Sequence, residues 1–394
     1  MRILLANFTK MVGDSGGMAK VCCSFANEMT KREHEVTLIY SDEKTGDFFY
    51  PVNDKVKCYD LRPYNGKSID FPLYMKAKRE ILRSFSKIKA RTVNNDFTKK
   101  YLLGNLKELL NTIKPDIIVS FQPAASKALI CDLKVDIPVI TMSHGDPEDY
   151  FHTYPLEEIP AIEKSTINQV LITSFEEHLK KHLPAAKIIT IGNAIPQFDF
   201  SADLASDKKI YKIIFVGRLN KNHKRPHLLI EAFAEICNNY PNWIVELWGA
   251  EDGKTYYLEL KKLIKLKKIE DKVFLKGSSD NIPEKLRQAD IYVIPSAYEG
   301  FGMALAEGMS VGLPAIGYKS CPAVNELIVD GKTGILCADG VSPLAQALAQ
   351  LMQNKELRIK MGVAAKADMA EYSPEKIWDK WEDLLKKSAI NKNR

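Results

Sequence analysis

Short apolar runs alternate along the chain with longer stretches whose apolar positions have helical spacing. In the first half, six runs rich in β-branched and other apolar residues predict strands, at residues 2–7, 35–40, 116–121, 138–142, 170–173 and 187–191. Apolar positions three and four apart predict helices at 17–31 and 101–114. The second half repeats the alternation from Lys212 onward. This pattern predicts an α/β protein with doubly wound sheets, whose ligand crevices lie at the carboxyl ends of the strands.

Length and a break in the pattern predict two domains. A chain of 394 residues exceeds what one hydrophobic core usually supports. Residues 196–210 are rich in Asp and Ser and lack periodicity, as expected of an interdomain connection. The last segment opens with serine and proline, a common helix start, and continues as an apolar stripe. The predicted organisation is a first domain at 1–195, a connection at 196–210, a second domain at 211–372 and a terminal helix at 373–394.

Composition indicates an ordinary globular protein and argues against several other classes. Hydrophobic residues make up 45% of the chain and charged residues 27%. No apolar run approaches the ~18 residues of a membrane span, and the short run after Arg2 predicts a strand, not a signal peptide. The seven cysteines are scattered without a C-x-x-C pair, which favours reduced thiols in the cytoplasm. A net charge of +6 is too mild to imply nucleic acid as a partner.

Positive charge is concentrated between Lys76 and Lys100. This stretch holds nine Lys or Arg against Glu80 and Asp96. Its apolar residues recur at helical spacing, at Met75, Ile81, Leu82, Phe85 and Ile88. A basic amphipathic helix is a candidate for contact with an anionic membrane surface or with a phosphate-bearing acceptor. A solvated helix with one face packed on its domain explains the pattern equally well.

The most informative window runs from Ser296 to Glu307. It follows a predicted buried strand at 291–294 and leads into a predicted helix at 303–311. Glu299 lies in the glycine-bearing loop, and Glu307 lies eight positions later, about two turns along. Backbone N–H groups of residues 300–303 would point out of the helix start, where anionic groups bind. A carboxylate in that loop can accept hydrogen bonds from sugar hydroxyls, whereas the simpler alternative is a capped helix whose glycines serve only the turn.

Arg218 and Lys224 follow another predicted buried strand. A pyrophosphate group carries negative charge, and this charge grows when a diphosphate departs as a leaving group. The sequence contains no D-x-D triplet that would hold a divalent metal. A guanidinium and an ammonium group are therefore candidates for stabilising that charge without a metal. The alternative is a pair of solvent-exposed loop cations. Arg225 is a further cation, or a residue that alters the loop.

Together these segments resemble the retaining glycosyltransferases of the GT-B fold that carry the E-x7-E signature. The resemblance rests on Phe215-Val-Gly-Arg-Leu219, on Lys224, on Glu299 and Glu307, and on the order of the segments around them. Residues 211 to about 340 match closely, and residues 1–200 match in outline. The implied fold is GT-B, with two Rossmann-like domains facing across a cleft.

The resemblance also implies roles for individual residues. Glu307 would hold the ribose hydroxyls, Arg218 and Lys224 the pyrophosphate, and Glu299 the sugar. The remaining donor-binding residues are expected to act largely through their backbone, at Gly16, Gly17, Gly217, Gly300, Phe301, Gly302 and Met303. His144 follows a predicted strand and matches the family's histidine beside the reacting centre, although a lone histidine is often structural. The expected catalytic residues are His144, Arg218, Lys224 and Glu299.

The expected activity is transfer of a hexose or N-acetylhexosamine from a nucleotide-sugar, with a UDP-sugar as the expected donor. The acceptor would be a hydroxyl of a glycan or lipid-linked sugar in bacterial surface polysaccharide synthesis. No cofactor or metal is expected, and the protein would work in the cytoplasm or at the inner face of the cell membrane. Two alternatives remain open: another GT-B enzyme, such as a sugar-nucleotide epimerase or a phosphorylase, and a nucleotide-sugar-binding protein without turnover.

Overall fold

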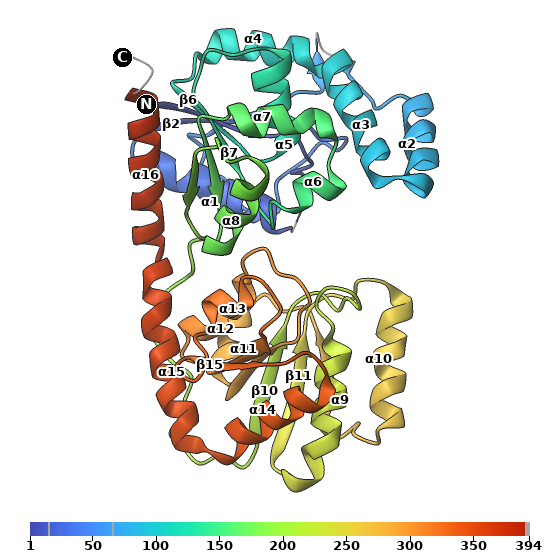
Figure 1. Cartoon of the computed structure of the whole chain (residues 1–394), viewed down its shortest axis with the longest axis vertical. Helices are drawn as coiled ribbons and strands as arrows, with labels where there is room; N and C mark the ends of the chain where they lie inside the picture. The colour runs from blue at the N-terminus through green and yellow to red at the C-terminus, as the bar shows by residue number, and fades with distance from the viewer. Residues whose placement is uncertain (15, 65–66, 391–394) are drawn as a thin grey trace. The chain divides into compact units, whose positions relative to one another are not determined.

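The computed structural model describes residues 1–14, 16–64 and 67–390. The chain divides into two compact units, the first formed by Met1–Gly192 and the chain from Trp378 onward, the second by Asn193–Ile377. Each unit is built on its own parallel sheet with helices around it (Figure 1). The predicted pair of doubly wound α/β domains is therefore confirmed.

The first unit contains a seven-stranded sheet in the order β3-β2-β1-β6-β7-β8-β9, with every neighbouring pair parallel. Its strands are β1 (Arg2–Asn7), β2 (Glu35–Tyr40), β3 (Lys57–Asp60), β6 (Ile117–Ser120), β7 (Val139–Met142), β8 (Ile167–Val170) and β9 (Ile188–Thr190). A separate antiparallel pair is formed by β4 (Pro63–Tyr64) and β5 (Lys67–Ser68). All four residues of β6 are buried, as expected for the centre of a sheet covered on both faces.

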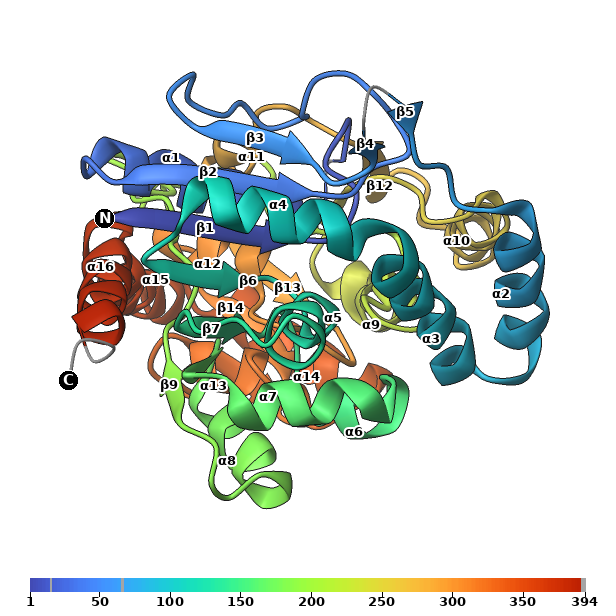
Figure 2. The ribbon, with the colours of Figure 1, turned by 90° about the horizontal axis from the view of Figure 1, so that it is seen from above.

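The longer helices of the first unit are α1 (Gly17–Lys31), α2 (Leu73–Phe85), α3 (Lys87–Phe97), α4 (Leu103–Ile113) and α8 (Thr173–His182). Shorter ones are α5 (Pro123–Ser126), α6 (Asp149–Thr153) and α7 (Ile159–Lys164). The stretch expected to form one basic helix forms two, α2 and α3, which pack against each other as a hairpin at the edge of the unit (Figure 2). The break falls at Ser86, whose extended backbone (φ −157°) and Oγ, accepting from the Lys89 N–H at 3.3 Å, make it the N-cap of α3.

The terminal helix α16 (Pro374–Ile390) joins the first unit from Trp378 onward. The rings of Trp378 and Trp381 lie edge-on to Phe25 of α1, with centroids 5.4 and 4.9 Å away. Arg32, just after α1, donates to Asp379 at 2.7 Å and to Glu382 at 2.9 Å. An apolar stripe flanked by ion pairs thus holds the end of the chain on α1.

The second unit contains a six-stranded parallel sheet in the order β12-β11-β10-β13-β14-β15. Its strands are β10 (Tyr211–Val216), β11 (Trp243–Trp248), β12 (Val273–Gly277), β13 (Ile291–Ile294), β14 (Ala315–Tyr318) and β15 (Gly334–Cys337). Its helices are α9 (Pro226–Ile236), α10 (Lys254–Leu266), α11 (Ile282–Arg287), α12 (Met303–Ser310), α13 (Val324–Leu327), α14 (Val341–Gln353) and α15 (Lys355–Met369). Strand residues such as Phe215, Val245 and Ile291 share one core with Leu229 and Phe233 of α9.

Two predicted segments differ in detail from the structure. Residues 196–210 do not stand apart as a connection but belong to the second unit, where Leu204 is buried and the Ala202 N–H donates to the Val311 carbonyl at 2.7 Å. The strand predicted at 170–173 is β8, which ends at Val170. Leu171 and Ile172 are also buried, although they lie beyond the end of the strand. The apolar run in the sequence is therefore longer than the strand itself. Among the described helices, none is both long and apolar enough to cross a membrane.

Candidate active site

Two loops meet at the carboxyl edge of the second sheet. One follows β10 and the other follows β13, and these two strands are hydrogen-bonded neighbours. Their carboxyl ends therefore lie side by side, where α/β sheets bind ligands. The Ala297 N–H of the second loop donates to the His223 carbonyl of the first at 2.7 Å. This contact ties together the segments that carry most of the predicted site residues.

Lys224 and Glu299 form a close ion pair across these loops. The Lys224 ammonium donates to both carboxylate oxygens of Glu299, at 2.6 and 2.7 Å. The Ser296 hydroxyl also donates to Glu299 Oε1, at 2.6 Å. The Glu299 side chain is only 7% exposed and that of Lys224 22%. The carboxylate is therefore fixed in place, and it orients an ammonium group that retains one further N–H for a ligand.

Two glycines allow β10 and β11 to end close together beside this pair. A Cβ on Gly249, whose φ is +148°, would stand 2.0 Å from the Gly217 carbonyl oxygen. A Cβ on Gly217 would be 3.3 Å from the Phe215 ring and 3.6 Å from the Lys224 stem. Glycine at 249 is thus required by backbone approach, and Gly217 leaves room for the Lys224 side chain.

The two arginines of the β10–α9 loop have different surroundings. Arg218 is exposed, and no side chain of the described part of the chain pairs with its guanidinium. Arg225 instead donates to the Pro295 carbonyl at 2.9 Å and to the Ser296 carbonyl at 3.0 Å. Its backbone is left-handed (φ +49°) at the N-cap of α9. Arg225 is therefore a brace for the Glu299 loop, a role that its sequence context did not reveal.

The glycine-bearing loop closes onto α12 as predicted. Gly302 takes the left-handed conformation (φ +84°) at the helix N-cap, and Phe301 is buried edge-on against Tyr372 at 5.4 Å between centroids. Glu307 lies about one turn into α12, not two, because the residues before Met303 form the loop. Burial, together with the nearby charges of Glu299 and Glu307, raises the pKa of Tyr292 well above its ordinary value.

Three predicted residues belong to the first unit. His144 lies in the loop after β7, with its ring stacked on Phe121 at 5.5 Å between centroids. Its Nε2 is buried and makes no hydrogen bond to any described residue. Burial lowers the pKa of His144 to about 4, so the imidazole is neutral near pH 7. Gly16 caps α1, with its N–H donating to Asp14 at 3.1 Å, and open space surrounds Gly17.

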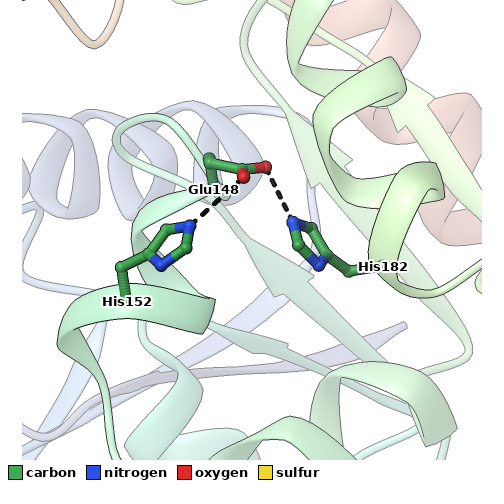
Figure 3. A group of neighbouring side chains, drawn as sticks. All are labelled: Glu148, His152 and His182. Carbon is green, nitrogen blue, oxygen red and sulfur yellow. Dashed lines mark hydrogen bonds and ion pairs between the residues drawn. The ribbon is translucent and has the colours of Figure 1, made fainter.

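Glu148, four residues beyond His144, lies among imidazole and ammonium side chains, and Figure 3 shows it between His152 and His182. This group was not predicted from the sequence. Its two oxygens hydrogen-bond His152 Nε2 at 3.3 Å and His182 Nε2 at 2.9 Å. Lys181 donates to the same carboxylate at 3.1 Å. The hydrogen bond from His182 is the largest of the effects that lower the pKa of Glu148 to about 2. Only the i, i+4 spacing of Glu148 and His152 was visible in the sequence, since His182 comes from α8.

Comparison with known proteins gives the family. Residues 15–196 match the model of Glycosyltransferase Family 4, and residues 196–368 match that of Glycosyl transferases group 1. N-acetyl-alpha-D-glucosaminyl L-malate synthase of Bacillus anthracis is 31% identical over 230 residues, which are 56% of this chain and 58% of that protein. Amylovoran biosynthesis glycosyltransferase AmsD of Erwinia amylovora is 25% identical over 385 residues, 95% of this chain and 97% of that protein.

Solved structures agree on the fold. The structure of a mutant of S. aureus TarM in complex with Fondaparinux, alpha-GlcNAc-glycerol and UDP matches with a TM-score of 0.74 and 17% identity, over 98% of this chain and 100% of that one. Two parallel-sheet α/β units of this kind define the GT-B fold. With the two family models adjoining at residue 196, the chain belongs to the GT-B glycosyltransferases of the family 4 type.

Proposed function

We propose that this glycosyltransferase moves a hexose or N-acetylhexosamine from a UDP-sugar to a hydroxyl of a glycan or lipid-linked acceptor, with retention of anomeric configuration. The observation that carries the proposal is the Lys224–Glu299 pair at the carboxyl edge of the second sheet, with the exposed Arg218 on the same loop. The S. aureus TarM structure that matches this fold contains UDP, which supports uracil as the base.

The cations account for the departing nucleoside diphosphate. Two N–H groups of Lys224 are engaged by Glu299, so the third is held in a fixed direction for a phosphate oxygen. Arg218 can offer a planar guanidinium fork to the same pyrophosphate. The negative charge that develops on the diphosphate in the transition state would then be stabilised by cations that are already oriented. Such preorganised groups stabilise a transition state efficiently because they need no reorganisation during the reaction. We infer that this chain uses these cations in place of a metal.

Glu299 serves both the lysine and the sugar in this mechanism. An ionised carboxylate offers about four lone-pair sites. Lys224 and Ser296 occupy three of them. The remaining site can accept one sugar hydroxyl, so a single side chain couples the orientation of Lys224 to the position of the transferred sugar. Glu307, about a turn into α12, is assigned to the ribose hydroxyls.

The transfer step is proposed to be a front-face substitution. The acceptor oxygen bonds to the anomeric carbon as the bond from that carbon to the phosphate oxygen breaks, and the acceptor proton passes to the departing phosphate oxygen. His144 would supply a neutral imidazole, and its buried Nε2 makes no hydrogen bond to any described residue. The N–H groups of residues 300–303 and the glycines at 16 and 17 would complete the donor contacts.

The acceptor is assigned from the relatives. AmsD is named for amylovoran biosynthesis, and it aligns with nearly the whole of this chain. We therefore assign the acceptor to a growing bacterial surface polysaccharide or its lipid-linked precursor.

The test measures UDP release and radiolabelled product with a panel of UDP-, GDP- and ADP-sugars. Arg218→Ala, Lys224→Ala and Glu299→Ala should each abolish transfer while the circular dichroism spectrum stays unchanged. Lys221→Ala is the matched control, because Lys221 is a lysine of the same loop that pairs with Glu259 on the surface. Normal turnover in the first three variants would refute the assignment, and donor binding without any nucleotide release would show a binding protein instead. Proton NMR of the new linkage tests retention.

A further inference from the structure

Helix α2 has two apolar sides, and only one of them packs against the protein. Met75 is buried in the core of the first unit, and Leu82 packs against the same core. Arg79 lies over the Phe71 ring at 4.7 Å, which covers the helix on that side. This side accounts for the attachment of α2 to its unit.

The other side of α2 presents large apolar residues to solvent. Leu73, Ile81 and Phe85 are 83%, 62% and 84% exposed, and the neighbouring Tyr74 is 58% exposed. Tyr74, Ile81 and Phe85 fall on one side of the helix and form an apolar row, and Leu73 lies further round the helix at its start. Four of the thirteen exposed large hydrophobic side chains in the described chain lie on these thirteen residues. Single exposed apolar residues are ordinary, but a continuous row marks an interaction surface.

The segment around this apolar row is rich in basic residues, of which Lys76, Lys78 and Arg83 have carboxylate partners. Between Lys76 and Lys100 nine basic residues outnumber two acidic ones, a net charge of +7. Lys87 and Lys89, at the start of α3, are exposed, and neither has an ion-pair partner among the described residues. Beside α2, a hollow of about 470 Å³ is lined by the side chains of Tyr74, Met75, Lys78, Asp96, Lys99 and Lys100. Lys78 pairs with Asp96 at 3.8 Å and Lys99 lies 4.0 Å from Asp132, so a phosphate group would meet lysines that are partly balanced by carboxylates.

We propose that α2 and the start of α3 bind the surface of an anionic lipid bilayer. The exposed row would lie at the boundary between headgroups and acyl chains with the helix axis parallel to the surface, and the lysines would contact lipid phosphates. Thirteen residues of α-helix measure about 20 Å, short of the ~30 Å of a bilayer core, so α2 lies on the membrane and does not span it. A symmetric pairing with a second copy of the chain would bring two such basic surfaces together, which like-charge repulsion opposes.

This proposal does not depend on the sugar donor or on any residue of the candidate active site. Vesicle binding without UDP release would support this proposal alone. UDP release without vesicle binding would support the proposed transferase function alone. The vesicle experiments therefore use the full chain without donor or acceptor, and UDP release is measured on the same variants without vesicles.

The first experiment tests the apolar row. The full chain is sedimented with vesicles of phosphatidylcholine alone or with added phosphatidylglycerol. The double variant Ile81→Asp/Phe85→Asp should bind the anionic vesicles at least tenfold more weakly. The matched control is Leu258→Asp/Leu266→Asp on α10, where both leucines are also exposed, at 54% and 73%. Both double variants add the same negative charge, so the control allows for the effect of charge alone. We expect the control to bind at least half as strongly as wild type. Equal losses in the two double variants would overturn the proposal.

The second experiment tests the charge. Lys87→Gln/Lys89→Gln should weaken binding to anionic vesicles several-fold, and the loss should shrink at high salt. Lys262→Gln/Lys265→Gln removes the same charge from exposed positions of α10 and should have little effect. Equally strong binding to phosphatidylcholine alone would refute the electrostatic part. Sedimentation of the lipid-free wild type as a dimer that Ile81→Asp/Phe85→Asp dissociates would show that a second copy covers the row, and would overturn the membrane assignment.

Discussion

Removal of the Lys224 ammonium should destabilise the second unit, because the Glu299 carboxylate would lose its counter-charge. Lys224→Met keeps much of the side-chain length but leaves the Glu299 carboxylate, only 7% exposed, without its counter-charge. Loss of one partner from a buried ion pair typically costs about 3–5 kcal/mol. Because Ser296 still donates to Glu299 and Lys224 is 22% exposed, we expect about 2–3 kcal/mol here.

A second substitution separates this cause from a simple loss of packing. Glu299→Gln in the same chain replaces the stranded carboxylate with a neutral amide that can still accept from Ser296. The double variant should therefore recover about 1–2 kcal/mol relative to Lys224→Met alone, a coupling of the size that contacting residues show. Transfer activity should remain absent in both, since neither restores the ammonium.

Urea unfolding followed by tryptophan fluorescence measures these differences. Trp243 and Trp248 lie on β11 of the second unit and report on its sheet. Lys221→Met is the control: its ion pair with Glu259 is exposed on both sides, so its unfolding free energy should change by less than about 0.5 kcal/mol. A double variant as unstable as the sum of its two single variants would refute the reasoning, because it would show that the carboxylate does not depend on the lysine.

Further expectations concern four other positions. Gly249→Ala should destabilise the second unit by about 2 kcal/mol or more and weaken UDP binding in calorimetry, since its Cβ would stand 2.0 Å from a carbonyl oxygen; unchanged binding would contradict this. Arg225→Ala should lower kcat/KM by about tenfold without contacting the donor, because the loop of Glu299 loses two hydrogen bonds. The pH profile of kcat should show no inflection from His144 between about pH 5.5 and 8, because its pKa is lowered to about 4; a profile that changes in this range on His144→Gln would contradict it. Glu148 has its pKa lowered to about 2, so its stabilising contribution is present above about pH 4.5 and is lost as pH falls toward 2; Glu148→Gln and wild type should therefore converge in thermal stability in that range.

The sequence predicted the architecture because both sheets are parallel and buried. Strands such as β6 and β13 are uninterrupted apolar runs, and their alternation with helical spacing is a strong local signal. The connection at 196–210 was misplaced for the opposite reason. Leu204 is its buried apolar side chain, and its other contacts include the Lys208–Asp290 ion pair at 2.7 Å and the hydrogen bond from the Ala202 N–H. A polar, aperiodic segment gives no sign of such contacts in the sequence.

The sequence singled out Lys224 and Glu299 as separate candidates, but it did not show the contact between them. Lys224 and Glu299 stand 75 positions apart, and only the adjacency of β10 and β13 in the sheet brings their loops together. Arg225 was expected to be a further cation or a residue that alters the loop, and its partners, two backbone carbonyls and Asp339, lie on other loops. Local patterns show which chemistry is present, whereas the order of strands determines which groups can touch.

The packing of α16 on α1 has a consequence for how the protein is made. Residues 1–192 of the first unit are synthesised before the second unit, yet the indole rings that cover Phe25 belong to Trp378 and Trp381, which follow the second unit. During synthesis of the second unit, this apolar surface of α1 lacks the cover that it has in the finished fold, and exposed apolar surface of this kind favours non-native contacts. The domain that begins folding first is thus the last one to finish.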